Sequence, residues 1–264
     1  LFPYTTLFRS LPASRGLDLS QGPEGAPLRQ EFRRGFEYSD CWVDDSRLVI
    51  LNLIDAARNG ACILSRTRAL RARRDGETWL LEMQGDDGTA QVVRSRALVN
   101  AAGPWVQDVI QGVTGLNSAQ NVRLVKGSHI VVPKFWNGPQ AYLLQNSDRR
   151  VIFVNPYEND LALIGTTDIP YDGRAEEVAI GADETDYLFQ VLRRYFRMPP
   201  QPSEIVHAFS GVRPLYDDNA DNPSAVTRDY VFEVHGAEGA PPLLSIFGGK
   251  ITTYRRLAEQ AMQR

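Results

Sequence analysis

The chain has 264 residues, so we expect one large domain or two intertwined domains. Its net charge of −3 lacks the basic excess that is typical of nucleic-acid-binding proteins, and we expect no nucleic-acid partner. No apolar run reaches the roughly 20 residues that a membrane-spanning helix needs. Two cysteines, Cys41 and Cys62, are too few for a disulfide framework or an all-cysteine zinc site, and we expect no metal centre.

Both ends of the chain are abrupt. Residues 1–10 follow neither a helical nor a strand pattern and lack the basic start and long apolar stretch of a signal peptide, so we interpret them as a non-native remnant. At the other end, an amphipathic run over 252–262 stops two residues before the last position. These two features predict that the chain is a piece of a longer protein.

The first half of the chain predicts a loop, one helix and several short strands. Residues 11–30 are rich in Gly, Pro and Ser and predict the loop. Asp44-Asp45-Ser46 offers caps for an apolar run over 48–57 that ends at Asn59-Gly60. Because this run is apolar on nearly all sides, we expect a buried helix. Strands are expected over 61–64, 69–71, 78–83, 90–93 and 96–100, followed by a short helix from Trp105.

From residue 122 onward, short apolar runs separated by turns predict an antiparallel sheet. Its expected strands cover 122–132, 141–145, 151–154 and 161–164. We expect Asp183 to cap a helix whose apolar face holds Leu188, Val191, Leu192 and Tyr195. Further strands are expected over 206–209, 230–234 and 243–247, before a final helix. The simplest architecture is a cofactor domain interrupted by a substrate domain.

Two turns join a strand to a helix through glycine and carry the candidate chemistry. Residues 98–105 (LVNAAGPW) put small side chains where a flat group can approach the backbone, and an ordinary tight turn is the alternative. Residues 247–254 (FGGKITTY) expose N–H groups at a helix start, and Lys250 adds a cation that suits an anion or a polarised carbonyl. An exposed lysine at a plain helix start is the alternative there. The chain has no G-x-G-x-x-G sequence.

Two arginines and one histidine are candidates for binding and catalysis. Arg213 and Arg228 lie beside turns, where a guanidinium fork can bind a phosphate or carboxylate. The alternative is a surface salt bridge, for example between Arg228 and Asp229 or Asp217. His129 lies in an apolar strand and could act as a general acid or base, or be an ordinary hydrogen-bonded core histidine.

Seven motifs occur in a single order along the chain. They are RGFEYSDCWVDDSRL (34–48), ALVNAAGPWV (97–106), RLVKGSHIVVP (123–133), LIGTTDIPYDG (163–173), SGVRPLYDD (210–218), TRDY (227–230) and SIFGGKITTYRRLAE (245–259). This order closely resembles the FAD-dependent, quinone-reducing glycerol-3-phosphate dehydrogenases, which are D-amino-acid-oxidase-like flavoproteins. The resemblance runs from about Leu11 to the last residue.

The resemblance implies an α/β (α+β) fold in which an FAD-binding α/β layer is interrupted by a mainly antiparallel β-sheet substrate domain. It also implies truncation at both ends, without the N-terminal G-x-G-x-x-G unit and the C-terminal helical domain of the family. The expected parts are a remnant (1–10), a loop and substrate-domain edge (11–40), the first FAD-binding part (41–112), the substrate domain (113–203) and the second FAD-binding part (204–264).

The same resemblance implies roles for individual residues. Ala69 would lie against the adenine of FAD. The residues near the adenosine and pyrophosphate would be Ala101, Ala102 and Gly103, and those beside the flavin ring would be Gly248, Gly249, Lys250, Ile251 and Thr252. The cations that bind glycerol 3-phosphate would be Arg213, Arg228 and Lys250, and Arg213 and Lys250 would also act in catalysis. His129 would be the base or the group that orients the substrate hydroxyl.

The implied reaction oxidises sn-glycerol 3-phosphate to dihydroxyacetone phosphate, with hydride transfer from carbon 2 to N5 of FAD and electrons passed to quinone. The family would work as a homodimer on the cytoplasmic, inner face of the membrane, attached peripherally. The alternatives are an α-glycerophosphate oxidase with oxygen as acceptor, another amine or hydroxy-acid oxidase of this fold, or a fragment without catalytic activity.

Overall fold

The computed structural model describes residues 12–217 and 229–264, and it mixes helices with strands as the sequence predicted. The chain divides into two compact units. Unit 1 consists of the stretch up to Val43 together with Gly127–Asp168 and Ala179–Ser210. Unit 2 consists of Asp44–Lys126, Ile169–Val178 and Gly211–Arg264.

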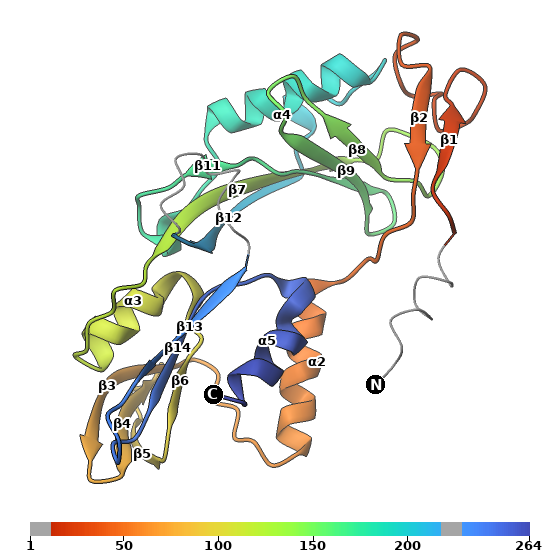
Figure 1. Ribbon diagram of the computed structural model, residues 1–264. Coiled ribbons are helices and arrows are strands. Elements are labelled where there is room, and N and C mark those ends of the chain that lie inside the picture. Colours follow the sequence, from red (N-terminus) through yellow and green to blue (C-terminus); the bar gives the residue numbers. More distant parts are fainter. Residues whose placement is uncertain (1–11, 218–228) are drawn as a thin grey trace. The chain divides into compact units, whose positions relative to one another are not determined.

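Unit 1 is built around an antiparallel sheet with one helix on it (Figure 1). In the sheet, β7 pairs with β10, β10 with β9 and β9 with β8, and β12 also pairs with β7. A separate hairpin joins β1 to β2. The elements are β1 (Arg15–Asp18), β2 (Arg34–Glu37), β7 (Val122–Pro133), β8 (Tyr142–Gln145), β9 (Val151–Tyr157), β10 (Leu161–Gly165), α4 (Ala182–Tyr195) and β12 (His207–Tyr216), and unit 2 holds the start of β7 and the end of β12.

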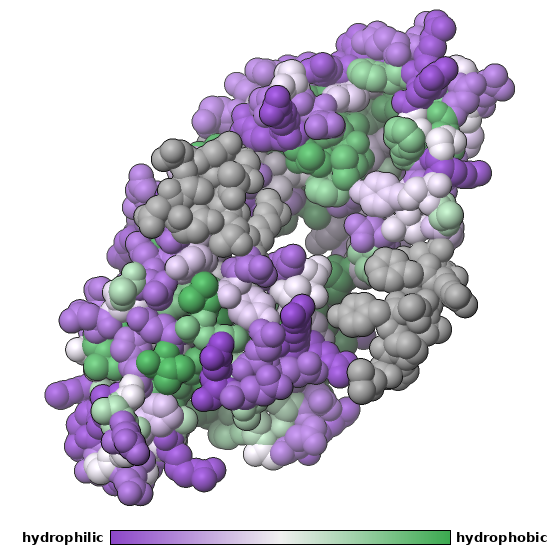
Figure 2. All heavy atoms as spheres, viewed as in Figure 1, coloured by the Kyte–Doolittle hydropathy of each residue, from purple (hydrophilic) through white to green (hydrophobic). Residues whose placement is uncertain are grey.

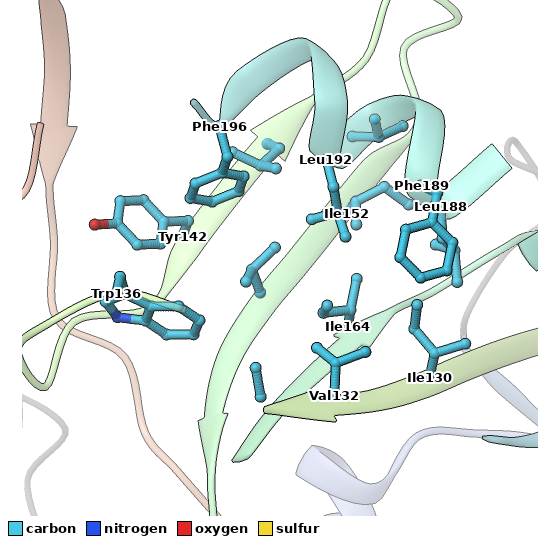
Figure 3. Close-up of a cluster of buried hydrophobic side chains, with 14 of the residues drawn as sticks. Ile130, Val132, Trp136, Tyr142, Ile152, Ile164, Leu188, Phe189, Leu192 and Phe196 are labelled. Atoms are coloured by element: carbon cyan, nitrogen blue, oxygen red, sulfur yellow. The ribbon is translucent and has the colours of Figure 1, made fainter. Parts of the chain in front are cut away.

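The core of unit 1 lies between α4 and the sheet. Leu188 and Leu192 of α4 point toward Ile152, Ile164 and Val132 on the strands (Figure 3), and all five side chains are fully buried. Their spacing on α4 puts the apolar positions on one face, as the sequence predicted. Burying one such side chain stabilises a fold by about 1.5–3 kcal/mol. This packing fixes the sheet relative to α4.

Unit 2 contains two three-stranded sheets. One has the order β3-β4-β5 and is antiparallel, and the other has the order β13-β14-β6 with β14 and β6 parallel. Buried Trp79 and Leu243 connect the two sheets in one cluster. The elements are α2 (Asp45–Arg58), β3 (Thr67–Asp75), β4 (Thr78–Gly85), β5 (Ala90–Ser95), β6 (Leu98–Asn100), α3 (Val106–Asp108), β11 (Ile169–Pro170), β13 (Tyr230–His235), β14 (Leu243–Gly248) and α5 (Tyr254–Ala261).

The predicted burial of the helix over 48–57 is wrong. The helix forms as α2, with Asp44 as its N-cap accepting a hydrogen bond from the Arg47 N–H and Asn59 as its C-cap. None of its residues is buried, and Val49 is 52% exposed. An apolar helix is buried only where another surface covers it, and the described residues provide no such cover. Figure 2 shows hydrophobic side chains at the surface between hydrophilic ones.

Several predicted boundaries also differ. Residues 61–64 form no strand: they lie in the connection between the end of α2 at Arg58 and the start of β3 at Thr67. The predicted loop over 11–30 contains β1, whose partner β2 lies outside that window. The cap of α4 is Gly181, and Asp183 lies inside the first turn. The strand expected over 206–209 extends to Tyr216, and the last helix starts with a 3-10 turn over Ile251–Thr253.

Candidate functional site

Two glycine turns leave the same edge of one sheet in unit 2. Strands β6 and β14 are parallel, with Leu98 opposite Leu243 and Asn100 opposite Ser245. Parallel strands present their carboxyl ends at a common edge, and open α/β sheets bind ligands outside that edge. The predicted cofactor residues at the ends of the two strands are Ala101, Ala102, Gly103, Gly248, Gly249, Lys250, Ile251 and Thr252, of which Gly248 is the last residue of β14.

A buried asparagine, which the sequence reasoning missed, shapes the first of these turns. Asn100 is 4% exposed, and its Nδ2 donates to the Val106 carbonyl at 2.9 Å and to Ser245 Oγ at 3.5 Å. Its Oδ1 accepts from the Ala102 N–H at 3.3 Å. A polar residue inside the apolar run RALVN was the available signal, since buried polar groups are almost always hydrogen-bonded. Asn100 therefore holds both the turn and the neighbouring strand.

Glycine is required in these turns for two different reasons. Gly103 has φ +55°, while a Cβ there would meet only Pro214 Cγ at 3.9 Å. At Gly103 the positive φ, and not a lack of space, therefore favours glycine. Gly248 has φ +78°, and a Cβ there would lie 2.6 Å from the Asp229 carbonyl oxygen and 3.1 Å from the Tyr216 N. The fold itself thus demands glycine at 248.

Lys250 lies exposed and extended between the second turn and the helix. Its φ of −141° and ψ of 151° place it directly before the 3-10 turn over Ile251–Thr253, which continues into α5. Gly249, with φ +107°, precedes it. The first N–H groups of a helix and an adjacent ammonium group both favour negative charge. This end of the sheet can therefore receive an electron-rich or anionic group.

A tryptophan–carboxylate contact anchors the first turn on its outer side. Trp105 Nε1 donates to Glu176 Oε1 at 2.7 Å. The pKa of Glu176 is lowered, first by a hydrogen bond from its own backbone N–H and then by the Trp105 hydrogen bond, because both favour the ionised carboxylate. Glu176 follows β11 in unit 2, so this contact connects that segment to the turn after β6.

The remaining predicted residues lie elsewhere. Ala69 is half-buried in β3, on the other sheet of unit 2, opposite Met83 and next to a β-bulge. Arg213 is half-buried within β12 rather than after a strand, and Arg228 lies outside the described residues. Asp217, a predicted salt-bridge partner of Arg228, pairs with Arg123 at 3.0 Å.

His129 belongs to unit 1 and is held between two neighbours. Its ring stacks on Phe209 with centroids 5.1 Å apart and an interplanar angle of 13°. Gly165 faces it across the β7–β10 pair, and a Cβ there would lie 2.3 Å from His129 Cδ2. Because the ring is half-buried, one part of it remains accessible. Packing, and not only the strand, therefore fixes the His129 ring.

The edge of β6 and β14 brings together two features that suit a flat cofactor with an electron-rich rim. A methyl carbon added at Gly103 would meet no atom closer than Pro214 Cγ at 3.9 Å, and the helix start with Lys250 provides positive potential. Within the described ranges, no three His, Cys, Asp or Glu side chains gather as a metal site. No helix in those ranges is both long and apolar enough to cross a bilayer.

Comparison with known proteins identifies relatives over almost the whole chain. The chain is 57% identical over 257 residues to a D-erythritol 1-phosphate dehydrogenase of Brucella abortus, and the match covers 97% of this chain and 51% of that protein. It is 51% identical over 264 residues to a glycerol-3-phosphate dehydrogenase of Pseudomonas aeruginosa, covering 99% and 51%. The chain therefore spans about half the length of these curated relatives.

A solved structure and a family model also match this chain over most of its length. The fold is similar to the glycerol-3-phosphate dehydrogenase from Bacillus halodurans complexed with FAD, with a TM-score of 0.73 and 25% identity over 97% of this chain and 48% of that one. Residues 8–255 match the DAO family of FAD dependent oxidoreductases. Since that match covers nearly the whole chain, the protein belongs to the DAO family of FAD dependent oxidoreductases.

Proposed function

We propose that this chain supplies the substrate sheet and the flavin-edge turns of an FAD-dependent dehydrogenase that oxidises a secondary hydroxyl of a polyol phosphate. The observation that carries the proposal is the pair of glycine turns at one edge of β6 and β14 in a chain of this family. Glycerol 3-phosphate is the first candidate substrate, with dihydroxyacetone phosphate as product. The names of several relatives support it.

The residues fall into groups with different tasks in this proposal. FAD, when bound, would supply the acceptor for the hydride from carbon 2 of the substrate. Lys250 and the helix start beside it favour negative charge on the neighbouring group. Arg213 and Arg228 bind the phosphate dianion through charge-assisted hydrogen bonds. His129 orients the substrate hydroxyl and takes its proton. Ala69, Ala101, Ala102 and Gly103 line the adenosine side.

D-erythritol 1-phosphate is a second candidate substrate, because the Brucella relative named for it shares 57% identity. Both compounds carry a phosphate monoester and secondary hydroxyls, so the same cations and base serve either one. The difference lies in one additional hydroxylated carbon. A plain methylene would be discriminated by roughly 10–200-fold in kcat/KM, and a site that hydrogen-bonds the additional hydroxyl would discriminate more strongly.

A chimeric enzyme tests the reaction. This chain replaces the matching region of the Pseudomonas aeruginosa enzyme, and anaerobic flavin bleaching is recorded with glycerol 3-phosphate, D-erythritol 1-phosphate and unphosphorylated glycerol. We expect bleaching by at least one phosphate ester and none by glycerol at equal concentration. Equal bleaching by glycerol would contradict the proposed binding of the phosphate by Arg213 and Arg228. A chimera that contains FAD but is bleached by neither ester would contradict the proposed reaction.

Lys250 is tested in the same chimera. Lys250→Met keeps the side-chain stem and removes the charge, so we expect slower flavin reduction and a lower flavin midpoint potential. The change is bounded by a charge interaction of a few kcal/mol, from about 4 kcal/mol at 4 Å with an effective dielectric near 20. The matched control is Lys134→Met in unit 1. The Lys134 ammonium donates to the Gly138 carbonyl. Unchanged rates and potential in Lys250→Met would remove Lys250 from the site.

The isolated chain gives a separate test of cofactor binding. It has no G-x-G-x-x-G sequence to hold the FAD diphosphate, so we expect weak or no FAD retention after purification. The visible absorbance of the purified chain and of the chimera measures this directly. Stoichiometric flavin in the isolated chain would show that the residues described above suffice for binding.

The electron acceptor and the location are part of the proposal. Quinone is the proposed acceptor, on the cytoplasmic face of the membrane with peripheral attachment, and a homodimer is the proposed assembly. Hydrogen peroxide formation during turnover of the chimera would indicate the oxidase alternative. Flotation with lipid vesicles and light scattering test the attachment and the assembly.

A further inference from the structure

Glu184 is a charged residue buried in the core of unit 1, at 1% exposure. It occupies the third position of α4, where its Oε2 accepts from the Gly181 N–H at 2.9 Å. That contact is the ordinary capping role of a glutamate at this position. The second oxygen, Oε1, is not needed for capping and faces the sheet.

The Oε1 atom accepts hydrogen bonds from two hydroxyl groups that belong to different segments. Ser128 Oγ of β7 donates to it at 2.7 Å, and Thr167 Oγ1, which follows β10, donates to it at 2.7 Å. The Ser128 N–H in turn donates to Thr167 Oγ1 at 2.9 Å. Ser128 and Thr167 are 0% and 1% exposed. A buried carboxylate that accepts several hydrogen bonds is far costlier to disrupt than an exposed one.

A third segment is attached through the same hydroxyl. Ser128 Oγ and Ser210 Oγ of β12 are 2.7 Å apart. Because the single Ser128 hydroxyl proton points to Glu184, Ser210 must donate to Ser128. Glu184 thus connects β7, the turn after β10 and β12 through one carboxylate oxygen.

These three segments are the ones that carry and pack His129. Ser128 precedes His129, Ser210 follows Phe209, and Thr167 lies two residues after Gly165. Neighbouring residues of a strand point to opposite faces of the sheet. The serines therefore point inward to Glu184, while His129 and Phe209 stack on the other face.

We propose that Glu184 is a positioning residue, whose buried carboxylate fixes the segments that hold the His129 ring between Phe209 and Gly165. The kinetic part of this proposal rests on the proposed role of His129 as base. The positional part does not, since it concerns only the ring and its neighbours. Glu184→Gln is the informative change, because an amide cannot accept from both the hydroxyls and the Gly181 N–H.

The first experiment uses the chain itself with labelled histidine. The ring resonance of His129, assigned with a His129→Gln variant, reports the stacking on Phe209. We expect Glu184→Gln to move it toward the shift of an exposed histidine and Asp183→Asn, an exposed carboxylate in the same helical turn, to leave it unchanged. An unchanged His129 resonance in folded Glu184→Gln would overturn the proposal, because a purely stabilising residue gives that result.

Ser128→Ala keeps the test decisive if Glu184→Gln does not fold. It removes one donor and leaves the capping contact intact, so we expect the His129 resonance to move in the same direction by a smaller amount. An unchanged resonance in Ser128→Ala would equally overturn the proposal.

The second experiment measures kinetics in the chimera. We expect Glu184→Gln to lower kcat/KM by about tenfold to hundredfold at unchanged flavin content, since small misplacements of catalytic groups have effects up to that size. Asp183→Asn should match the wild type. Wild-type kinetics in His129→Gln would refute the proposed base while leaving the resonance test valid. A loss in His129→Gln without a loss in Glu184→Gln would refute the positioning role.

Discussion

Helices α2 and α4 both have 14 residues, yet they differ completely in burial. The more polar sequence, that of α4, contains five buried residues, whereas the apolar α2 contains none. In α4 the apolar residues share one face, and the sheet of unit 1 covers that face. In α2 they surround the axis, and a sheet can cover only one side of a helix. Among the described residues, a sheet covers the one-sided apolar face of α4, whereas no surface covers the apolar residues of α2.

The same contrast holds for the units as wholes. Unit 1 has one continuous core that joins α4, the sheet and the segment at Leu28. The buried residues of unit 2 form smaller separate clusters, around Trp79 and Leu243 and around Val106, Ile110 and Phe247. We infer that unit 1 depends on packing, while much of the apolar surface of unit 2 contributes little to its stability.

The strongest test of this comparison replaces one leucine in each helix. Leu192→Ala removes a fully buried side chain from α4, and we expect a loss of about 2–5 kcal/mol in the free energy of unfolding of unit 1. Leu51→Ala in α2, where the side chain is 51% exposed, should change stability by less than about 0.5 kcal/mol. Native-state hydrogen exchange of each helix gives both values. Similar losses at the two positions would refute the comparison.

Close packing around His129 predicts the next largest effect. Gly165→Ala would place a methyl group 2.3 Å from His129 Cδ2, and relieving such overlap costs about 1–3 kcal/mol. Gly16→Ala in β1 is the matched control, because the added methyl carbon would have no neighbouring atom within 4 Å. Urea unfolding of both variants measures the difference. Equal stability would mean that the His129 ring moves away freely.

A third prediction concerns Arg213, which belongs to unit 2. If its role is substrate binding, Arg213→Ala in the chimera should lower kcat/KM by at least about tenfold, because each charge-assisted hydrogen bond contributes about 1.5–3 kcal/mol. Arg213→Lys should recover only part of the activity, since the guanidinium fork is lost. Steady-state kinetics with glycerol 3-phosphate measures the effect. Wild-type kinetics in Arg213→Ala would favour a surface salt bridge.

The smallest expected effect concerns pH and the loop that contains Asp148. Partial burial opposes ionisation of Asp148, but hydrogen bonds from Arg150 and Tyr187 outweigh it, so its pKa lies below the usual value. The resulting stability is present above the unfolded pKa and is lost as pH falls through the folded one. Because the pair is partly exposed, we expect less than about 1 kcal/mol. Asp148→Asn should weaken this acid dependence in urea unfolding between about pH 6 and 3.

Local signals in the sequence predicted much of the fold. The group Asp44-Asp45-Ser46 contains the N-cap of α2, Asp44, and the predicted stop at Asn59-Gly60 contains its C-cap, Asn59. The apolar face of α4 follows from its spacing. The β1–β2 hairpin was missed because its strands are separated by a long turn and its pairing is non-local. The burial of α2 was misjudged because a sequence does not state which surface will cover a helix.

The candidate site depends more than the fold on contacts between distant segments, which a sequence does not show. The glycine turns were found because strand–glycine–helix patterns are local. Asn100 with Ser245, and Glu184 with Ser128, are pairs 145 and 56 residues apart in the chain. A buried glutamate in a helix reads as an ordinary capping residue from sequence alone. Only the folded structure shows from which distant hydroxyl groups Glu184 accepts hydrogen bonds.

The hydrogen bonds to Glu184 also have a consequence for proton exchange with water. Hydroxyl protons of serine and threonine normally exchange too fast to be observed, because solvent reaches them. The protons of Ser128 and Thr167 lie inside the core and point to one carboxylate oxygen. They can exchange only when α4 separates from the sheet, so their lifetimes record how often the core of unit 1 opens.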